Sequence, residues 1–229
     1  MKGKLLIGVA ALVVVTGGLT VWCKFYRDAP QPQWITSDAR NAFLYGAVDA
    51  KEARGIPYWI WLALPRMFPE YMPAPGGYAS LGLPWEETLE MPAGFAKKTV
   101  GHVRVTGNCA MCHTISYSGT PDEIPAVKIT AADEARNIQP LLTFFTQCAQ
   151  DPRFNANEIL AEVDNATKLS FVDRLLYRYV LIPRTKKALM SPESAIFATA
   201  LQLHAKNPRA GFNEQQMKEL AAWLKGQGH

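Results

Sequence analysis

The sequence predicts a mainly α-helical domain with long ordered loops, preceded by one N-terminal transmembrane helix. Three observations lead to this fold class. Residues 5–23 are apolar and uncharged, and several segments between residues 141 and 225 place apolar side chains at helical spacing. An alternating pattern typical of a strand is found only around residues 99–105. The 16 glycines and 16 prolines indicate long irregular connections between the helices.

The N-terminal segment combines the basic residues Lys2 and Lys4 with the apolar stretch at 5–23. A helix over this stretch would be about 28 Å long, close to the bilayer core of about 30 Å. The long apolar centre and the lack of a small-residue cleavage pattern favour an uncleaved signal-anchor over a cleaved signal peptide. The bulky Trp22 argues against lipid attachment at Cys23. We therefore expect residues 1–27 to anchor an exported protein.

The remainder divides into a Pro- and Gln-rich linker at residues 28–36 and one domain at residues 37–229. Periodicity and capping residues predict helices at 38–54, 57–65, 141–148, 157–163 and 171–182, a further one beginning at 191, and a last one ending near 225. Residues 69–101 and 114–132 are predicted as loops. Because long ordered loops are uncommon without a function, the first is expected to wrap a large cofactor.

The charge and the cysteine content of the chain argue against nucleic-acid binding and against a disulfide-stabilised fold. The formal net charge is +4, and no phosphate-cradling or base-reading motif accompanies it, so nucleic acid is not expected as a partner. The four cysteines, Cys23, Cys109, Cys112 and Cys148, are too few for a disulfide framework in a chain of this length. Cys23 and Cys148 lie in apolar surroundings typical of unpaired thiols.

The residues Cys109-Ala110-Met111-Cys112-His113 match the C-x-x-C-H pattern of c-type haem attachment. Two thiols near one turn apart reach two vinyl groups of one porphyrin, and the adjacent imidazole binds the iron as the proximal ligand. A redox dithiol would require a βαβ context, and a structural zinc ion would require four ligands. We therefore expect one covalently attached haem c, held by Cys109, Cys112 and His113, in a cytochrome c-like haem domain.

The residue on the opposite face of the iron is less clearly indicated. We predict Met190, because it lies in a loop before a helix start rather than in a helical stripe. The alternatives are His204, His102, Met217 and an open position. A His/Met iron is suited to electron transfer, whereas an open position allows O₂ or peroxide chemistry. Three charged residues near the motif, Glu90, Lys97 and Arg104, are candidates for contacts with a haem propionate or a substrate.

Blocks around the motif carry a family resemblance. The blocks are "GIPYWIWLALPRMFPEYM", "GGYASLGL", "MPAGFAKKTVGHVRVTGNCAMCHT" and "LLYRYVLIPRT", within about residues 45–185. Together they resemble the rubber-oxygenase-like family of bacterial c-type cytochromes, which is related to the di-haem peroxidases. The resemblance implies an exported, loop-rich, mainly helical haem protein, with His113 as the motif ligand of an iron that can bind oxygen. That family carries two haem motifs, so this chain is interpreted as a single-haem relative.

These observations favour a membrane-anchored mono-haem c-type cytochrome that transfers electrons between redox partner proteins. The expected location is a bacterial inner membrane, spanned once, with the haem domain in the periplasm. The alternative is a haem-dependent oxygenase or peroxidase-type enzyme with an open distal site. A haem-bearing subunit or sensor is a third hypothesis. An electron carrier is favoured over an enzyme because no triad, nucleotide loop or acid/base pair is recognisable, and no small-molecule substrate is indicated.

Overall fold

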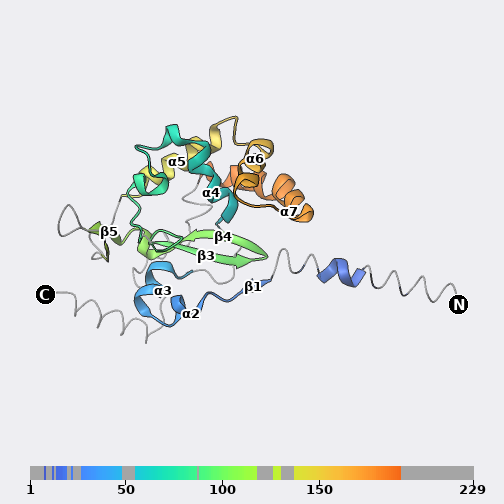
Figure 1. Ribbon diagram of the computed structural model, residues 1–229, viewed down its shortest axis with the longest axis horizontal. Coiled ribbons are helices and arrows are strands. Elements are labelled where there is room, and N and C mark those ends of the chain that lie inside the picture. Colours follow the sequence, from blue (N-terminus) through green and yellow to red (C-terminus); the bar gives the residue numbers. More distant parts are fainter. Residues whose placement is uncertain are drawn as a thin grey trace.

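The computed structural model describes residues 27–47, 55–86, 88–117, 126–129 and 137–191, together with positions 8, 12, 14–19 and 22. The elements follow one another along the chain in this order (Figure 1): β1 (Asp28–Ala29), α2 (Gln33–Thr36), α3 (Ala39–Tyr45), β2 (Ile56–Pro57), α4 (Tyr58–Met67), η1 (Pro69–Tyr71), η2 (Gly77–Leu81), β3 (Phe95–Val100), β4 (His102–Gly107), η3 (Cys109–Met111), β5 (Thr114–Tyr117), β6 (Ala126–Ile129), α5 (Gln139–Gln150), α6 (Ala156–Ala166), α7 (Phe171–Leu176), η4 (Tyr177–Leu181) and α8 (Ile182–Leu189).

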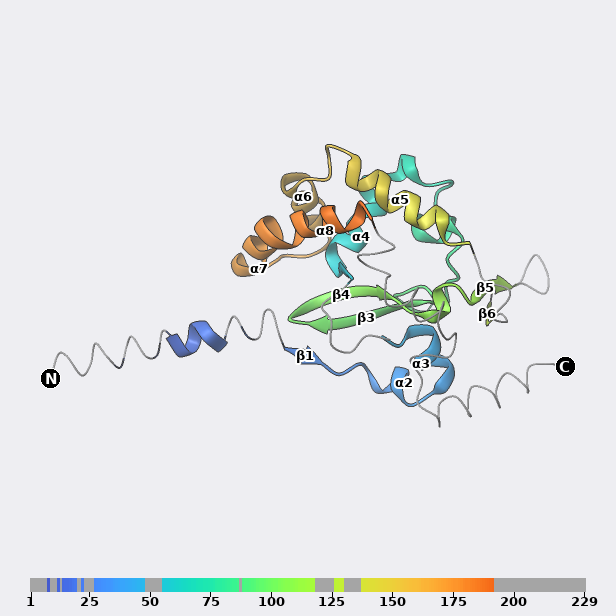
Figure 2. The ribbon, with the colours of Figure 1, turned by 180° about the vertical axis from the view of Figure 1, so that it is seen from behind.

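A four-stranded antiparallel sheet with the order β1-β3-β4-β2 lies at the centre. Its main part is the β3–β4 hairpin, which reverses at Gly101 with φ of 70°. Valine and threonine recur along both strands, and these β-branched residues favour extended backbone. Helices α4 to α8 lie on one side of the hairpin, and α2 and α3 lie on the other (Figures 1 and 2).

The predicted mainly α-helical, cytochrome c-like fold is therefore wrong. Residues 95–107, of which the larger part was assigned to a loop, form the hairpin, and β5 and β6 form a second antiparallel sheet within the other predicted loop. The alternating pattern around residues 99–105 falls on the end of β3 and on β4, but it does not extend over the rest of β3, because charged residues stand there among the apolar ones. Lys98, for example, is only 9% exposed and lies 3.5 Å from Asp28. Burial of such paired charges removes the simple alternation of apolar and polar residues.

The predicted transmembrane helix is likewise not shown. In the part of the chain that the structure describes, no helix has both the length and the apolar character needed to cross a bilayer. Most of residues 1–26 lie outside the described part, as do the predicted helices beyond residue 191. Residues 28–36, expected as a linker, contain β1 and α2.

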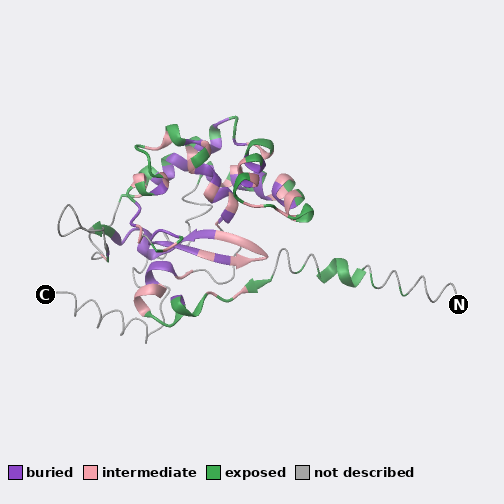
Figure 3. Cartoon of the chain, in the orientation of Figure 1, coloured by how far each residue is buried: buried purple, intermediate pink, exposed green. Residues whose placement is uncertain are grey.

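The main core lies between the hairpin and helices α4 to α8. Trp61 is its centre: the ring stacks on Tyr78 with centroids 4.0 Å apart and lies beside Phe95 and Phe145. All four side chains are buried. Figure 3 shows burial concentrated on the facing sides of the helices and at the end of the hairpin opposite its turn. Phe95 thereby anchors the beginning of β3 to the helical layer.

Several predicted helices are confirmed, with changed ends. The predicted helix at 57–65 corresponds to α4, and Ser170 caps α7 by accepting a hydrogen bond from the Asp173 amide at 3.1 Å. The predicted stop at Pro183 is wrong, because a π-helical turn at Tyr177–Leu181 leads directly into α8. Pro183 lies in the first turn of α8, where a residue without an N–H group is tolerated. The helix predicted from residue 38 corresponds to α3, which is capped by Asp38 and ends at Tyr45.

A charged junction joins the η1 turn to the segment between α5 and α6. The Asp151 carboxylate accepts hydrogen bonds from the Tyr71 hydroxyl at 2.8 Å and from the Arg153 Nη2 at 2.8 Å. Arg153 also pairs with Glu70 and donates to the Met67 carbonyl at 3.2 Å. The hydrogen bonds from Arg153 hold the pKa of Asp151 well below its usual range. The junction therefore stabilises the ionised carboxylate.

We expect this junction to make the fold sensitive to acid. A carboxyl group whose pKa is lower in the folded than in the unfolded chain stabilises the fold above its unfolded pKa, which is about 3.9 for Asp, and loses that contribution as the pH falls below it. The urea midpoint of the wild type should therefore fall between pH 6 and pH 3. Asp151→Asn should lower the urea midpoint at pH 6, and its midpoint should then fall less between pH 6 and pH 3 than that of the wild type.

Glu158→Gln, which removes an exposed carboxylate on α6, is the control. A pH response of Asp151→Asn equal to that of the wild type would contradict this role.

Candidate functional site

The cysteine motif forms a tight turn at the end of β4. Asn108 precedes it and is almost completely buried. Its side-chain oxygen accepts a hydrogen bond from the Ala110 amide at 2.9 Å, which caps the η3 turn. Its side-chain nitrogen donates to the carbonyls of Leu44 and Gly46 at 3.3 Å and 2.9 Å. One carboxamide therefore fixes the motif to the end of α3.

Gly94 brings a second segment against the same turn. It has φ of 93°, which L side chains rarely adopt, and a Cβ at this position would lie 2.3 Å from the Cα of Met111. The Gly94 amide donates to the Leu44 carbonyl, and its carbonyl accepts from the Asn108 amide, both at 2.9 Å. Only glycine permits this close approach. The turn before β3, the end of α3 and the motif thus form one hydrogen-bonded unit.

The three motif side chains are buried together. Cys109 is 2% exposed, Cys112 is 6% exposed and His113 is 4% exposed. Neither thiol is joined in a disulfide. Cys109 packs in a small apolar cluster with Ile35, Leu44 and Val127, whereas Cys112 belongs to the main core. The turn therefore lies where the two apolar clusters meet.

The electrostatics of the turn argue against a redox dithiol. Burial raises the pKa of the Cys109 thiol, and the neighbouring Cys112 raises it further. Reactive dithiol sites instead lower the pKa of one thiol, because the thiolate is the nucleophile. The described residues also contain no βαβ unit around the motif. The environment thus favours neutral, buried sulfur atoms over a thiolate that attacks a disulfide.

The donor set fits a covalently attached haem. Among the described residues, no group of three or more His, Cys, Asp or Glu side chains is arranged to hold one metal ion. A c-type haem does not need such a group, since its sulfur atoms bond to the porphyrin and only the imidazole binds the iron. The thiols of Cys109 and Cys112, the adjacent His113 and the apolar surroundings match that requirement.

The candidate distal ligands that the structure describes, Met190 and His102, lie in different environments. Met190 follows the last turn of α8 and is 44% exposed, unlike the buried motif residues. His102 begins β4, and both of its ring nitrogens are buried. His204 and Met217 lie outside the described residues. Sequence reasoning missed Asn108 and Gly94, although an asparagine directly before a turn and a glycine directly before a strand are the signals of a cap and of a close backbone approach.

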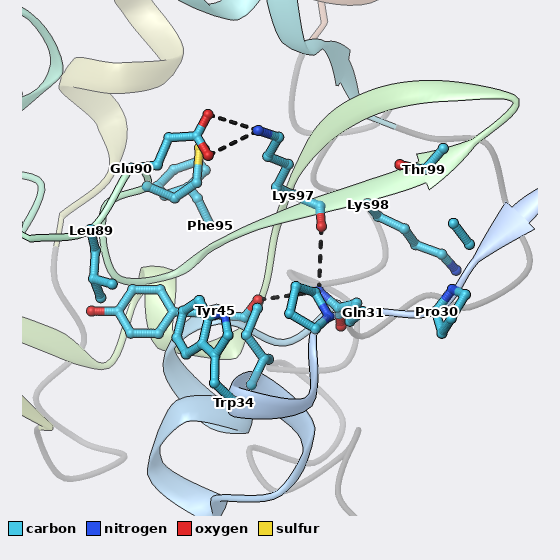
Figure 4. A pocket seen from close by; sticks show the side chains of 14 residues that line it. Pro30, Gln31, Trp34, Tyr45, Leu89, Glu90, Phe95, Lys97, Lys98 and Thr99 are labelled. Atoms are coloured by element: carbon cyan, nitrogen blue, oxygen red, sulfur yellow. Dashed lines mark hydrogen bonds and ion pairs between the residues drawn. The ribbon is translucent and has the colours of Figure 1, made fainter.

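A cavity of about 350 Å³ lies between α2, α3 and β3, close to the motif. Figure 4 shows its aromatic wall of Trp34, Tyr45 and Phe95, with the Lys97–Glu90 ion pair at the rim. Tyr45 also belongs to the apolar cluster that contains Cys109. Residues 109–113 themselves do not line the cavity. Lys97 and Glu90 were two of the charged candidates for ligand contacts. They form an ion pair with each other at 2.7 Å, so that their charges compensate each other.

Comparisons with known proteins add no functional assignment. No protein-family model matches the chain, and neither a curated protein nor a solved structure matches it. The interpretation of the site therefore rests on its own residues and their geometry.

We expect Asn108 to stabilise the site more than an ordinary helix cap does. Asn108→Ala removes three hydrogen bonds and leaves the buried Ala110 amide and the half-buried Gly46 carbonyl without this partner, whereas the Leu44 carbonyl keeps the Gly94 amide. It should lower the free energy of unfolding by about 2–3 kcal/mol. Asn155→Ala is the matched control, since Asn155 caps α6 from a partly exposed position, and should cost about 1 kcal/mol. Urea denaturation of both variants measures the difference. Equal losses would show that Asn108 acts only as a cap.

Proposed function

We propose that this chain is a mono-haem c-type cytochrome that transfers electrons on the exported side of a membrane. The observation that carries the proposal is the C-x-x-C-H turn, in which both thiols and the imidazole are buried side by side in the sequence and the thiols form no disulfide. The basic and apolar N-terminal residues support export. Redox partner proteins are the expected donors and acceptors of the electrons.

In this proposal each motif side chain has one role. The thiols of Cys109 and Cys112 would each add S–H across one vinyl C=C bond of a haem, which would give two thioethers without an oxidant. His113 would hold the iron through an imidazole nitrogen, and the hydrogen bond from its amide to the Ala110 carbonyl at 3.2 Å holds its backbone in the turn. Haem, when bound, supplies a one-electron Fe(III)/Fe(II) couple. The apolar side chains around the turn exclude water and thereby favour the state of lower charge.

A second candidate function is a haem enzyme that acts on O₂ or peroxide. One observation favours it: Met190, the predicted distal ligand, is exposed at the end of α8. If no side chain binds the iron opposite His113, a small molecule is able to do so. The two candidates share the same attachment site and differ only in the opposite face of the iron.

Covalent attachment is tested by removing the thiols. Full-length protein produced with a c-type haem maturation system should retain haem after denaturing electrophoresis. Cys109→Ser and Cys112→Ser should each leave one thioether and reduce the retained haem, and the double variant should lose it completely. Cys148→Ser is the matched control, since Cys148 is equally buried on α5, and should retain the wild-type amount. A haem-free wild type, or a double variant that keeps covalent haem, would refute the proposal.

Carbon monoxide separates the two candidate functions. If Met190 binds the iron, the reduced wild-type protein should not bind carbon monoxide, and Met190→Ala should bind it with a shift of the Soret band. Met72→Ala, which changes a partly buried methionine of the η1–η2 loop, should behave as wild type. Rapid binding of carbon monoxide by the wild type would instead support the enzyme. Binding by neither the wild type nor Met190→Ala would point to another protein ligand.

A further inference from the structure

The cavity between α2, α3 and β3 has the size of a site for a small molecule. Its volume is about 350 Å³, whereas protein interiors are packed closely and leave few spaces larger than a water molecule. Ligand pockets begin at about 300 Å³, and a cavity of about 150 Å³ holds one benzene molecule. The space therefore suits a molecule of about two fused rings.

The Gln31 side chain fixes the frame of this cavity. Its Nε2 donates to the carbonyls of Tyr45 at 3.4 Å and of Lys97 at 3.5 Å, and its Oε1 accepts from the Ala47 amide at 2.8 Å. One carboxamide thus joins the segment before α2 to the end of α3 and to β3 (Figure 4). Because these bonds lie within the wall itself, the cavity is preformed, as small-molecule sites usually are.

The lining is mainly apolar and aromatic. The rings of Trp34 and Tyr45 lie with their centroids 5.9 Å apart at an interplanar angle of 51°, and Phe95, Leu89 and Met91 extend the same wall. Trp34 is 47% exposed, whereas Tyr45 is 3% exposed, so the cavity reaches from the surface into the interior. Such rings offer a flat, rigid contact area to an aromatic molecule.

The charged groups that line the cavity are already paired. Lys97 binds Glu90 at 2.7 Å, and Lys98 lies 3.5 Å from a carboxylate oxygen of Asp28. A charged ligand would lose its hydration without gaining an uncompensated counter-charge, and this loss is costly in apolar surroundings. The cavity therefore favours a neutral molecule.

The Tyr45 hydroxyl supplies a polar contact for such a molecule. It is buried and makes no hydrogen bond with any residue that the structure describes. Burial and the nearby charge of Glu86 raise the pKa of this phenol, but the Glu86 carboxylate is itself bound by Arg40 at 2.6 Å. The hydroxyl thus stays protonated as a donor. Since buried polar groups are unfavourable without a partner, an acceptor atom on a ligand would stabilise this site.

We propose that this cavity binds a neutral, planar aromatic molecule of about two rings that carries a carbonyl oxygen. The rings pack against Trp34, Tyr45 and Phe95, and the oxygen accepts the hydrogen bond of the Tyr45 hydroxyl. The inference does not depend on haem, because residues 109–113 do not line the cavity. Tyr45 packs in the same apolar cluster as Cys109, so the ligand shares one wall with the cysteine turn.

Three matched probes test the ligand class by isothermal titration of the full-length protein. 2-Acetylnaphthalene has two fused rings and a carbonyl, naphthalene lacks the acceptor, and 2-naphthoate carries a charge. The ketone should bind about fivefold more tightly than naphthalene, because one net hydrogen bond distinguishes them. 2-Naphthoate should bind more weakly than the ketone, because its charge finds no free partner among the lining residues.

Variants of the wall test the assigned roles. Tyr45→Phe keeps the ring and should weaken the ketone about fivefold while leaving naphthalene unchanged. It should not lower the urea midpoint, since the lost hydroxyl has no partner among the described residues. Leu89→Trp fills the cavity with a larger side chain and should abolish binding of both probes. Tyr179→Phe, which changes an exposed tyrosine of η4, is the control and should bind as the wild type does.

Several outcomes would overturn the inference. The first is a wild type that does not bind the ketone, or binds it no better than Leu89→Trp does. The second is equal affinity of the wild type and Tyr45→Phe for the ketone. The third is a lower urea midpoint of Tyr45→Phe, which would show that the hydroxyl has a partner within the protein. If Leu89→Trp does not fold, Trp34→Ala, which removes a half-exposed ring, takes its place, and unchanged affinity for both probes would overturn the site.

Discussion

The candidate site depends on the hydrogen bonds of the Asn108 carboxamide. This one side chain binds the Ala110 amide on the motif and the carbonyls of Leu44 and Gly46 at the end of α3. The bonds to Ala110 and Leu44 are buried, so that water does not replace the carboxamide there. The Asn108 amide is bonded in turn to Gly94. The position of Cys109, Cys112 and His113 therefore follows from contacts between segments that are far apart in the sequence.

The hairpin connects this fixed turn to the rest of the protein. Phe95 at its beginning packs on Trp61 in the helical core, and its second strand leads through Asn108 into the cysteine turn. The two strands thus connect the apolar core to the turn that carries Cys109, Cys112 and His113.

Part of the fold was predictable because the signals are local. Ser170 stands directly before an apolar periodic segment, which is a local signal for a helix cap, and the helices α5 and α6 follow from apolar spacing. The alternating pattern around residues 99–105 indicated part of the hairpin, but the pairing of β3 with β4 and the continuation through Pro183 were not predicted. The adjacent Lys97 and Lys98 interrupt the pattern of β3, and the burial of Lys98 depends on neighbours that only the folded chain supplies. The π-helical turn at Tyr177–Leu181 has no comparable local signal.

The sequence by itself determined the chemical identity of the candidate site: two thiols and an imidazole with the spacing of a c-type haem motif. It also determined where most of the described helices lie, since helical spacing is a property of neighbouring residues. The tertiary structure alone decided that the motif follows an antiparallel hairpin, that Asn108 and Gly94 hold it and that Met190 is exposed. Each of these depends on burial and on contacts between distant segments, which local pattern does not encode.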